Sequence, residues 1–414
     1  MNRLVVRNIG PIKEVDICLN KVNVFIGPQS SGKSTLAKII SFCTWLEKRN
    51  EATDKAVVDG LVNRLQSFHK MNGYFRDDSA IFYHGTNVVF AYNWDEPLEL
   101  SESFQNYNSE HFRDKEILLT SVEKTVNPKV IYIPAERNFV SAVPNLKKYA
   151  EKDDSLQSFI NDWFEGKRHY TEDSSLPIID LGVDYYYNAG TDRDMLKLDK
   201  ANPVRLSAAS SGLQSIVPLV AMIKWMSSGI YEENKPFSPE EDQRVREMLS
   251  NLPEQITEAQ MELVNRIQGF IKGKVYTHTQ FIIEEPEQNI FPETQKTFLY
   301  YLLAEINHGR NHHLVLTTHS QYVLYALNNC MLAYLVKDKV TPDIESEVNI
   351  ECLKYAIDPK TVSVYEIRDG RICGLEQEAN ATIQDEDGLV RGNYFDRVMH
   401  NVMADFTNCL SFMD

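Results

Sequence analysis

The sequence lacks the cysteine pairs and basic runs that mark several common classes of protein. Its six cysteines are scattered and include no Cys-x-x-Cys pair, so zinc-site spacing is absent and a disulfide framework is not expected in a chain of this size. Acidic residues outnumber basic ones by 59 to 43, which gives a formal net charge of −16. Because phosphate contacts dominate affinity for nucleic acid, DNA is a less favoured partner.

Long apolar runs are also scarce. The most apolar stretch, residues 213–226, is interrupted by Pro218 and Lys224, so we expect no membrane-spanning segment. The first residues include Arg3 and Arg7, where a signal peptide would need an unbroken apolar core. We therefore expect a cytoplasmic protein that makes no contact with a membrane.

The chain does contain a strand, a glycine-rich loop and a helix in direct succession. Residues 4–6, 15–19 and 22–26 read as strands, and apolar residues recur at helical spacing from Lys33 onward. Between the last strand and the helix, the sequence GPQSSGKS fits G-x-x-x-x-G-K-[ST] at every fixed position. A phosphate-binding loop requires this order of elements.

The residue types in the loop indicate how it would hold a nucleotide. Its glycines let backbone N–H groups surround a phosphate, and the following helix directs its positive end toward the same point. Lys33 would contact the β- and γ-phosphates, and the Ser34 hydroxyl would ligate Mg²⁺. We therefore predict ATP and Mg²⁺ as cofactors. The predicted ATP-binding residues are Gly27, Pro28, Gln29, Ser30, Ser31, Gly32, Lys33, Ser34 and Thr35.

Two later apolar strands end in residues that can carry chemistry. Residues 281–283 lead into Glu284 and Glu285, and such a strand in a P-loop enzyme delivers a metal-coordinating acid and a residue that activates water. Residues 314–317 lead to His319, which makes that histidine a candidate for sensing the γ-phosphate. A surface acidic cluster is the alternative for the two glutamates, but it fits poorly after three large apolar residues.

Together and in this order, these segments resemble the ABC-type ATPases, in particular the branch near the chromosome-maintenance, RecF and OLD-family proteins. The ATPase components of bacterial antiphage systems such as PARIS and Septu are similar. The resemblance rests on the phosphate loop, Tyr-Ile-Pro-Ala-Glu-Arg at 132–137, Glu-Glu-Pro-Glu at 284–287 and Thr-Thr-His-Ser at 317–320. It implies an α/β fold: a P-loop ABC-type ATPase head with a mixed, mainly parallel sheet flanked by helices, plus α/β insertions.

The resemblance also implies how the site works. ABC-type heads form dimers in which the signature motif of one subunit covers the ATP on the P-loop of the other. The signature residues that would act in trans are Ser211, Gly212 and Gln214. By the same resemblance Glu284 would support Mg²⁺, Glu285 would be the general base and His319 would be the switch histidine.

The chain departs from the family pattern at three points. Glu284 stands where transporters have aspartate. The signature reads Ser-Ser-Gly-Leu-Gln at 210–214, and Leu-Ser at 206–207 offers a rival alignment. No glutamine follows the strand at 130–133, where relatives have their Q-loop, and residues 136–138 are Glu-Arg-Asn. Which of the three replaces the glutamine stays open at this point.

We predict a head domain assembled from several parts of the chain, with two insertions. The head takes residues 1–50, 128–140 and 204–375; the insertions are 51–127, a helix and hairpin, and 141–203, a helix and β segments; residues 376–414 form a C-terminal helical segment. Within that segment, residues 393–410 are amphipathic. The simpler interpretation is that this helix packs on its own head, and contact with a partner is the alternative.

OLD-family relatives carry a Toprim nuclease after the ATPase, and the sequence offers little for one. The strand predicted at 332–336 ends at Lys337, which has the wrong charge for a metal ligand. The Asp-x-Asp at Asp385 and Asp387 lies in a polar turn. We therefore expect no nuclease in this chain.

These observations favour a regulatory ATPase that binds and hydrolyses ATP. Its heads would form a dimer or a higher oligomer and gate a separate effector protein, as in the antiphage systems. A RecF-like ATPase of DNA repair or chromosome maintenance is the alternative, and acidity and the lack of sustained heptads for a coiled-coil arm tilt the choice against it. A transporter cassette fits least, because Lys33 and Glu284 are much further apart than in such cassettes.

Overall fold

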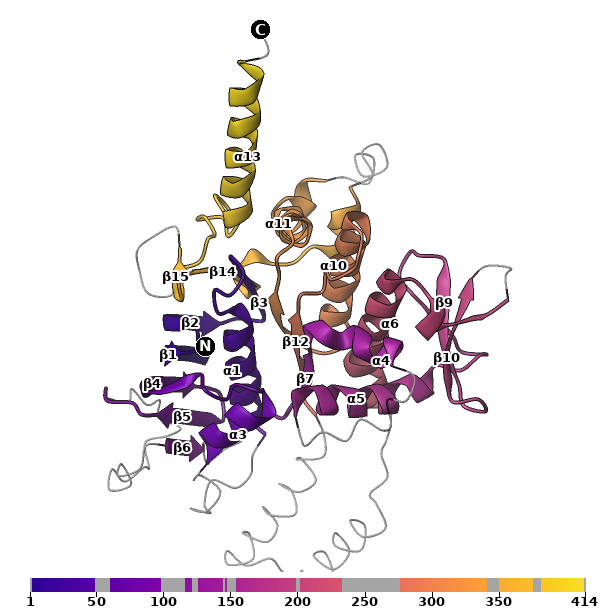
Figure 1. Ribbon diagram of the computed structural model, residues 1–414, viewed down its shortest axis with the longest axis horizontal. Coiled ribbons are helices and arrows are strands. Elements are labelled where there is room, and N and C mark those ends of the chain that lie inside the picture. Colours follow the sequence, from indigo (N-terminus) through magenta and orange to yellow (C-terminus); the bar gives the residue numbers. More distant parts are fainter. Residues whose placement is uncertain are drawn as a thin grey trace, which may run out of the picture.

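In the computed structural model, the described residues are 2–48, 60–97, 116–120, 126–143, 146, 154–198, 202–232, 276–340, 350–374 and 381–412. Their strands form two sheets (Figure 1). The larger has 11 strands in the order β6-β5-β4-β1-β2-β15-β14-β3-β13-β12-β7, and the smaller has four in the order β11-β10-β9-β8.

One half of the large sheet is antiparallel. Its strands are β1 (Asn2–Ile9), β2 (Ile12–Leu19), β4 (Phe75–His84), β5 (Val88–Tyr92) and β6 (Glu116–Thr120). β4 pairs with β1 with Arg3 opposite His84. The hairpin predicted within residues 51–127 therefore exists as β4 and β5, and it continues the main sheet. The short helix α3 (Leu61–Phe68) precedes it.

The other half is parallel. It consists of β14 (Val362–Arg368), β3 (Val22–Ile26), β13 (His313–Thr317), β12 (His278–Glu284) and β7 (Pro128–Ile133). β15 (Arg371–Cys373) joins the halves, since it runs antiparallel to β14 and parallel to β2. The expected mainly parallel sheet is thus found in this half alone. Its five strands present their carboxyl ends at one edge.

Both faces of the parallel half are buried, as the continuous apolar strands require. Phe25, Ile282 and Val315 lie in one hydrophobic cluster with the apolar face of α1 (Lys33–Leu46). Their neighbours along the strands point the other way, into a second cluster. The helices on that second face are α5 (Ser155–Gly166), α6 (Ser211–Lys224), α10 (Pro292–Asn307) and α11 (Gln321–Val336). Figure 1 shows α1 and α10 on opposite sides of these strands.

The second predicted insertion also contains the expected elements. α5 begins after Asp154, whose carboxylate caps it by accepting from the backbone N–H of Gln157 at 2.7 Å. The small sheet follows, and its strands are β8 (Leu176–Pro177), β9 (Val183–Asn188), β10 (Arg193–Leu198) and β11 (Val204–Arg205). Two short helices, α4 (Phe139–Ala142) and α7 (Ile230–Glu232), complete this side of the fold.

The strand predicted at 332–336 is wrong, because these residues are the last turns of α11. The hydroxyl of Ser320 caps this helix by accepting from the backbone N–H groups of Tyr322 and Val323. No proline or glycine interrupts the next 16 residues, so a helix started there continues through them. The charged sequence of residues 239–273 predicts helices that break at Pro253, and this stretch lies outside the described residues.

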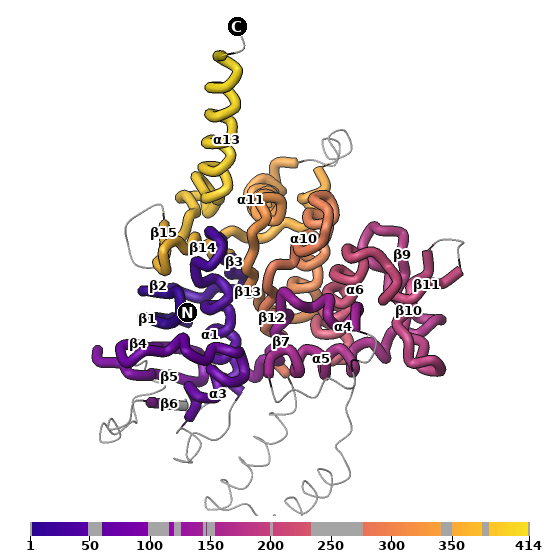
Figure 2. The backbone as a smooth tube through the Cα atoms, in the orientation of Figure 1, coloured from indigo at the N-terminus to yellow at the C-terminus, as the bar shows by residue number. Residues whose placement is uncertain are grey.

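The C-terminal helix α13 (Tyr394–Leu410) extends away from the rest of the protein (Figures 1 and 2). None of its residues is buried, so the simpler interpretation, a helix packed on its own head, is wrong. Among the described residues, only its first turn makes polar side-chain contacts with the rest of the protein. Asp396 accepts from the Tyr325 hydroxyl, and Arg397 pairs with the buried Glu366 of β14. The amphipathic pattern of residues 393–410 is therefore displayed rather than buried.

One described helix is long and apolar enough to cross a membrane by composition. It runs from Ser211 to Glu232, through α6 and α7, but 67% of its most apolar window is buried inside the fold. The helix covers the sheet, and this burial is typical of the core helix of a globular protein.

Two methionines on helices provide a matched test of this arrangement. Met331 of α11 is 0% exposed, whereas Met399 of α13 is 48% exposed. Met331→Ala is expected to lower the free energy of unfolding by about 2–5 kcal/mol, because it removes buried contacts and leaves a cavity. Met399→Ala is expected to change it by no more than about 0.5 kcal/mol. Urea denaturation measures both, and a comparable loss from Met399→Ala would contradict the projecting helix.

Candidate nucleotide-binding site

The predicted site residues meet at the carboxyl ends of the parallel strands. The register places Glu284 opposite Thr317 and Thr317 opposite Phe25, so the segments that follow β12, β13 and β3 lie side by side. β7 ends beside β12, with Ile133 opposite Ile283. Ligand sites of open α/β sheets form at such an edge, where the strands end and the loops diverge.

The phosphate loop needs its glycines for conformational reasons. Gly27 has φ +141° and Gly32, the N-cap of α1, has φ +111°. A Cβ on Gly27 would lie 2.1 Å from the carbonyl oxygen of Ile367, so strand β14 leaves room only for glycine there. Gln29 and Ser30 at the loop tip are exposed, and Thr35 is buried under the loop.

Lys33 holds its ammonium group inside this loop. It donates to the carbonyl oxygens of Gly27 at 3.0 Å and Pro28 at 2.7 Å, and to Ser31 Oγ at 3.4 Å. Burial lowers its pKa to about 8, although the Glu285 and Glu287 carboxylates act in the opposite direction. A partly desolvated cation surrounded by acceptors can exchange them for a phosphate, which is the stronger acceptor.

Glu284 has the properties of a metal ligand. It is buried, and its Oε1 atom makes no hydrogen bond. Burial raises its pKa, while the nearby hydroxyls of Tyr132 and Ser34 lower it. Ser34 and Glu284 therefore fit Mg²⁺, which protein sites hold through few carboxylates together with phosphates and water.

Glu285 occupies a different environment from its neighbour. Its Oε2 accepts from Gln288 Nε2 at 2.8 Å, and its Oε1 lies 3.4 Å from His319 Nε2. The contact with His319 is the largest reason that the pKa of Glu285 falls to about 2, with Gln288 and Lys33 adding to it against burial. The carboxylate is therefore ionised and can orient water. If His319 turned toward a phosphate, Glu285 would become a stronger base.

Glu287 holds together the two segments that carry Glu285 and His319. Its carboxylate accepts from the Thr318 hydroxyl at 2.9 Å and from the backbone N–H of His319 at 2.5 Å. The backbone N–H of Glu285 in turn donates to the carbonyl of Thr317 at 2.9 Å. The turn after β12 and the turn after β13 therefore form one unit, which carries Glu285 and His319 together.

Arg137 is the site residue that sequence reasoning did not assign. It is 0% exposed, and its guanidinium donates to the carbonyl oxygens of Glu284 at 3.1 Å, Glu285 at 3.1 Å and Pro286 at 2.8 Å. Burial lowers its pKa to about 10. It is a positioning residue that holds the backbone of the turn after β12 through these three hydrogen bonds. The run at 132–137 was a signal that this segment matters, but no spacing rule shows which carbonyls an arginine meets.

Two of the three residues at the expected Q-loop position act on Glu284. The NH groups of Arg137 donate to the carbonyl oxygens of Glu284, Glu285 and Pro286, whereas Glu136 is exposed and its charge raises the pKa of Glu284. Arg137 therefore acts on the backbone of the predicted metal ligand, and Glu136 acts on its carboxylate.

The predicted signature segment lies beside the turn after β12 and not on the phosphate loop of the same chain. Ser210 caps α6 by accepting from Leu213 N at 3.4 Å, and Gln214 Nε2 donates to the Ala209 carbonyl at 2.9 Å. A Cβ on Gly212 would lie 3.1 Å from the Asn289 carbonyl. Ser211 is exposed. In the chain as described, no contact found for this segment reaches the phosphate loop, so its action in trans stays a prediction.

The rival signature alignment at 206–207 fits the geometry less well. Leu206 is fully buried in the hydrophobic core, while Ser207 is exposed and accepts from Gln214 through its backbone carbonyl. A motif that covers a nucleotide needs an exposed helix start, which Ser211 has.

Comparison with known proteins gives a likeness in structure only. No family model and no curated protein matches the sequence. Similar solved structures include the SMC head domain from Thermotoga maritima, with 11% identity, 78% of this chain and 90% of that chain covered, and a TM-score of 0.33. The Pyrococcus furiosus Smc head bound to the C-terminal domain of ScpA has 11% identity, coverage of 90% and 95%, and a TM-score of 0.35. A dimeric ATP-binding cassette bound to ADP and Pi has 10% identity, coverage of 91% and 98%, and a TM-score of 0.26.

Because all three TM-scores are below 0.5, these structures do not indicate what this chain does. What the structure establishes by itself is an α/β fold with a mixed sheet and a glycine-rich loop between β3 and α1. Function therefore rests on the geometry of the site.

The environment of Glu285 predicts how stability depends on pH. Folding lowers the pKa of this carboxyl from 4.5 to about 2, so its stabilising effect is present above pH 4.5 and is lost as pH falls toward 2. Glu285→Gln should therefore lower the melting temperature at pH 7, and the gap to the unmodified protein should shrink between pH 4.5 and 2. Thermal unfolding at pH 7, 5, 4 and 3 measures it. The exposed Glu386→Gln is the control. A gap that stays constant at low pH would refute the prediction.

Proposed function

We propose that this protein binds and hydrolyses ATP. The observation that carries the proposal is the convergence of four groups at one sheet edge: the Lys33 ammonium, the Ser34 hydroxyl, the orphaned Glu284 oxygen and the Glu285–His319 pair. A cation in a glycine-rich loop, a hydroxyl and carboxylate for Mg²⁺, and a second carboxylate that orients water are the parts that phosphoryl transfer to water requires.

Each residue has a separable role in the proposed reaction. Lys33 offsets the negative charge of the β- and γ-phosphates, and Ser34 and Glu284 would hold Mg²⁺, which neutralises charge on the same oxygens. Glu285 positions the attacking water and accepts its proton. Before this step, His319 exchanges its contact with Glu285 for one with the γ-phosphate, which makes Glu285 a stronger base. Arg137 holds the three carbonyls of the turn, and so keeps the backbone that carries Glu284 and Glu285 in place.

ATP binding is tested at Lys33. Lys33→Ala removes the cation at the centre of the loop, so the affinity for Mg²⁺-ATP should fall tenfold or more in calorimetric titration. Lys21→Ala is the control, because Lys21 lies at the opposite end of β3 and its ammonium contacts only the Asn307 side chain among the described residues. Unchanged ATP affinity in Lys33→Ala would remove the basis of the proposal.

We infer further that two heads close on ATP. The start of α6 supports this inference, because a helix N-terminus with exposed Ser211 is an anion site that lacks a contact with its own phosphate loop. A second copy would bring the two together. The likeness of the motifs to ABC-type heads, which act as dimers, is the other support.

A separate effector protein is the proposed target of this cycle. The support is α13, which displays the apolar side chains of Val398, Met399, Val402, Met403, Phe406 and Leu410. Its one arginine, Arg397, is already paired with Glu366, and it has no lysine; this argues against a lipid or nucleic-acid surface as the occupant. An apolar groove on another protein fits the face. The likeness of the motifs to ATPases of antiphage systems supports a role in antiviral defence.

Glu285→Gln tests head closure and effector binding together. The variant keeps the shape of the side chain but loses its basicity, so it should bind ATP, stop hydrolysis and accumulate as a dimer or larger species. Added Gly212→Asp should abolish that assembly while ATP binding persists, because the new carboxylate would crowd the Asn289 carbonyl and repel the phosphates. Light scattering with and without ATP measures the mass.

The same preparation, expressed with the neighbouring genes, shows whether a partner is retained. Phe406→Ser on the apolar face of α13 should release the effector, and Asn408→Ser on the same helix should not. Recovery of the ATPase alone, with full biological activity when every neighbour is deleted, would contradict the effector proposal. ATP-dependent binding of duplex DNA by that protein would instead favour a RecF-like role.

A further inference from the structure

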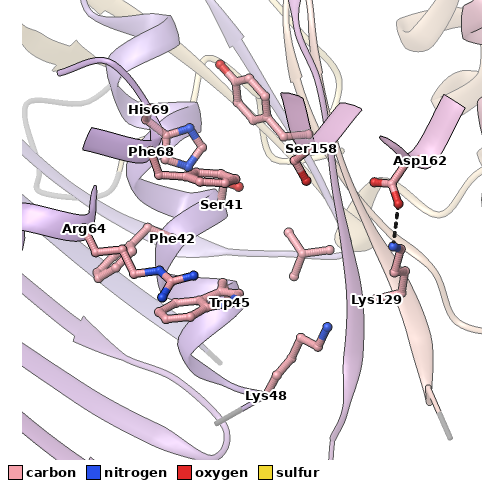
Figure 3. Close-up of a pocket in the computed structure, with 12 residues that line it drawn as sticks. Ser41, Phe42, Trp45, Lys48, Arg64, Phe68, His69, Lys129, Ser158 and Asp162 are labelled. Carbon is pink, nitrogen blue, oxygen red and sulfur yellow. Dashed lines mark hydrogen bonds and ion pairs between the residues drawn. The ribbon is translucent and has the colours of Figure 1, made fainter. Parts of the chain in front are cut away.

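A cavity lies against the second half of α1 (Figure 3). Its volume is about 280 Å³, and it is lined by the second half of α1, by α3, by β7 and by α5. Trp45 lies 12 residues after Lys33, which is about 18 Å along a helix. The cavity is therefore distinct from the proposed ATP site.

The walls of the cavity are cationic. Lys48, Arg64 and Lys129 line it, and the one carboxylate among the lining residues is Asp162, which pairs with Lys129 at 2.8 Å. Lys48 and Arg64 have no carboxylate partner among the residues that the structure describes. Burial is the largest reason that the pKa of Lys48 is lowered to about 8; repulsion by Lys129 lowers it further, and the Asp162 carboxylate acts in the opposite direction. A bound anion would relieve that repulsion.

The same cavity is lined by aromatic rings. Trp45 stacks against Phe42 with ring centroids 5.8 Å apart, and the guanidinium of Arg64 lies 4.5 Å above the Trp45 ring. Figure 3 shows Arg64 over Trp45 with Lys48 nearby at the edge of the cavity. Flat rings beside cations suit a ligand that has both a planar ring and negative charge.

His69 adds an independent sign of a missing ligand. Its side chain lines the cavity between Phe68 and Tyr132 and is 2% exposed, yet its Nδ1 atom has no hydrogen-bond partner. Burial lowers its pKa to about 3, so the ring is neutral and can serve as a donor or acceptor. Buried polar atoms are rarely left unpaired in folded proteins, and a ligand in the cavity would satisfy this one.

We propose that this cavity binds a nucleoside monophosphate. The phosphate would lie between Lys48 and Arg64, the base would lie along the Trp45 ring, and His69 would hydrogen-bond the edge of the base. The volume is at the lower limit of small-molecule sites, so it suits one base with one phosphate and not a dinucleotide or a nucleic-acid strand. Neither the phosphate loop nor the α13 face is involved.

The position of the cavity gives the ligand a route to the ATP site. Tyr132 lines the cavity, and its hydroxyl lies close enough to Glu284 to lower the pKa of that carboxyl. α1 connects the cavity to Lys33 directly. Occupancy is therefore expected to change the rate of ATP hydrolysis. This regulatory part rests on the proposed ATPase function, whereas the binding part does not.

Calorimetric titration of the full-length protein with AMP, GMP, CMP and UMP tests the binding. At least one of them should bind, and equally well to Lys33→Ala, which has lost the phosphate loop's cation. Lys48→Met and Arg64→Gln should each weaken binding tenfold or more, and Lys21→Met should not. Trp45→Leu should weaken binding of the nucleotide at least fivefold. Circular dichroism and melting temperature confirm that each variant is folded.

Three outcomes would overturn the proposal. The first is no binding of any monophosphate at millimolar concentration by the folded, unmodified protein. The second is binding that Lys33→Ala abolishes and Lys48→Met leaves intact, since the phosphate loop would then be the site. The third is inorganic phosphate that binds as tightly as the nucleotides, which would show an anion site with no role for the rings. Loss of ATP binding in Lys33→Ala concerns the proposed function alone and leaves this test unaffected.

Discussion

The buried guanidinium of Arg137 is the contact on which the candidate site depends. It donates to three successive carbonyl oxygens of the turn after β12, so the backbone that carries Glu284 and Glu285 cannot move without breaking charge-assisted hydrogen bonds in a dry environment. Glu285 has φ +42°, a conformation that a side chain other than glycine keeps only where its surroundings impose it. From the other side, Glu287 ties the same turn to Thr318 and His319.

This fixed turn separates three carboxylates that lie within four residues of one another. Burial raises the pKa of Glu284 and of Glu287, and hydrogen bonding lowers that of Glu285. Neighbouring carboxylates with opposed shifts can take different roles at one pH. One is left with an unpaired oxygen suited to a metal, one is an ionised group beside His319, and one is a structural acceptor.

The elements around the phosphate loop also connect the site with α13 and with the cavity around Trp45. β14 carries Glu366, which pairs with Arg397 at the base of α13, and the next residue, Ile367, packs against Gly27 of the phosphate loop. On the other side of the loop, α1 leads to the cationic cavity around Trp45. Both the projecting helix and the cavity are thus one element away from the proposed nucleotide. A change in the loop can reach either without a long chain of contacts.

The sequence by itself determined the local parts of this protein. The GPQSSGKS loop, the flanking strand and helix, and the apolar strands that end in Glu284 and Thr317 are all consecutive residues whose pattern is visible in a short window. Apolar composition alone was misleading at residues 332–336. They are as apolar as a strand, but they are the end of the helix that begins after Ser320. Tertiary structure alone decided which carbonyls Arg137 binds, that the 75–92 hairpin continues the main sheet, and that the amphipathic α13 is displayed. These outcomes depend on partners tens to hundreds of residues away, and periodicity records which face of an element is apolar but not what that face meets.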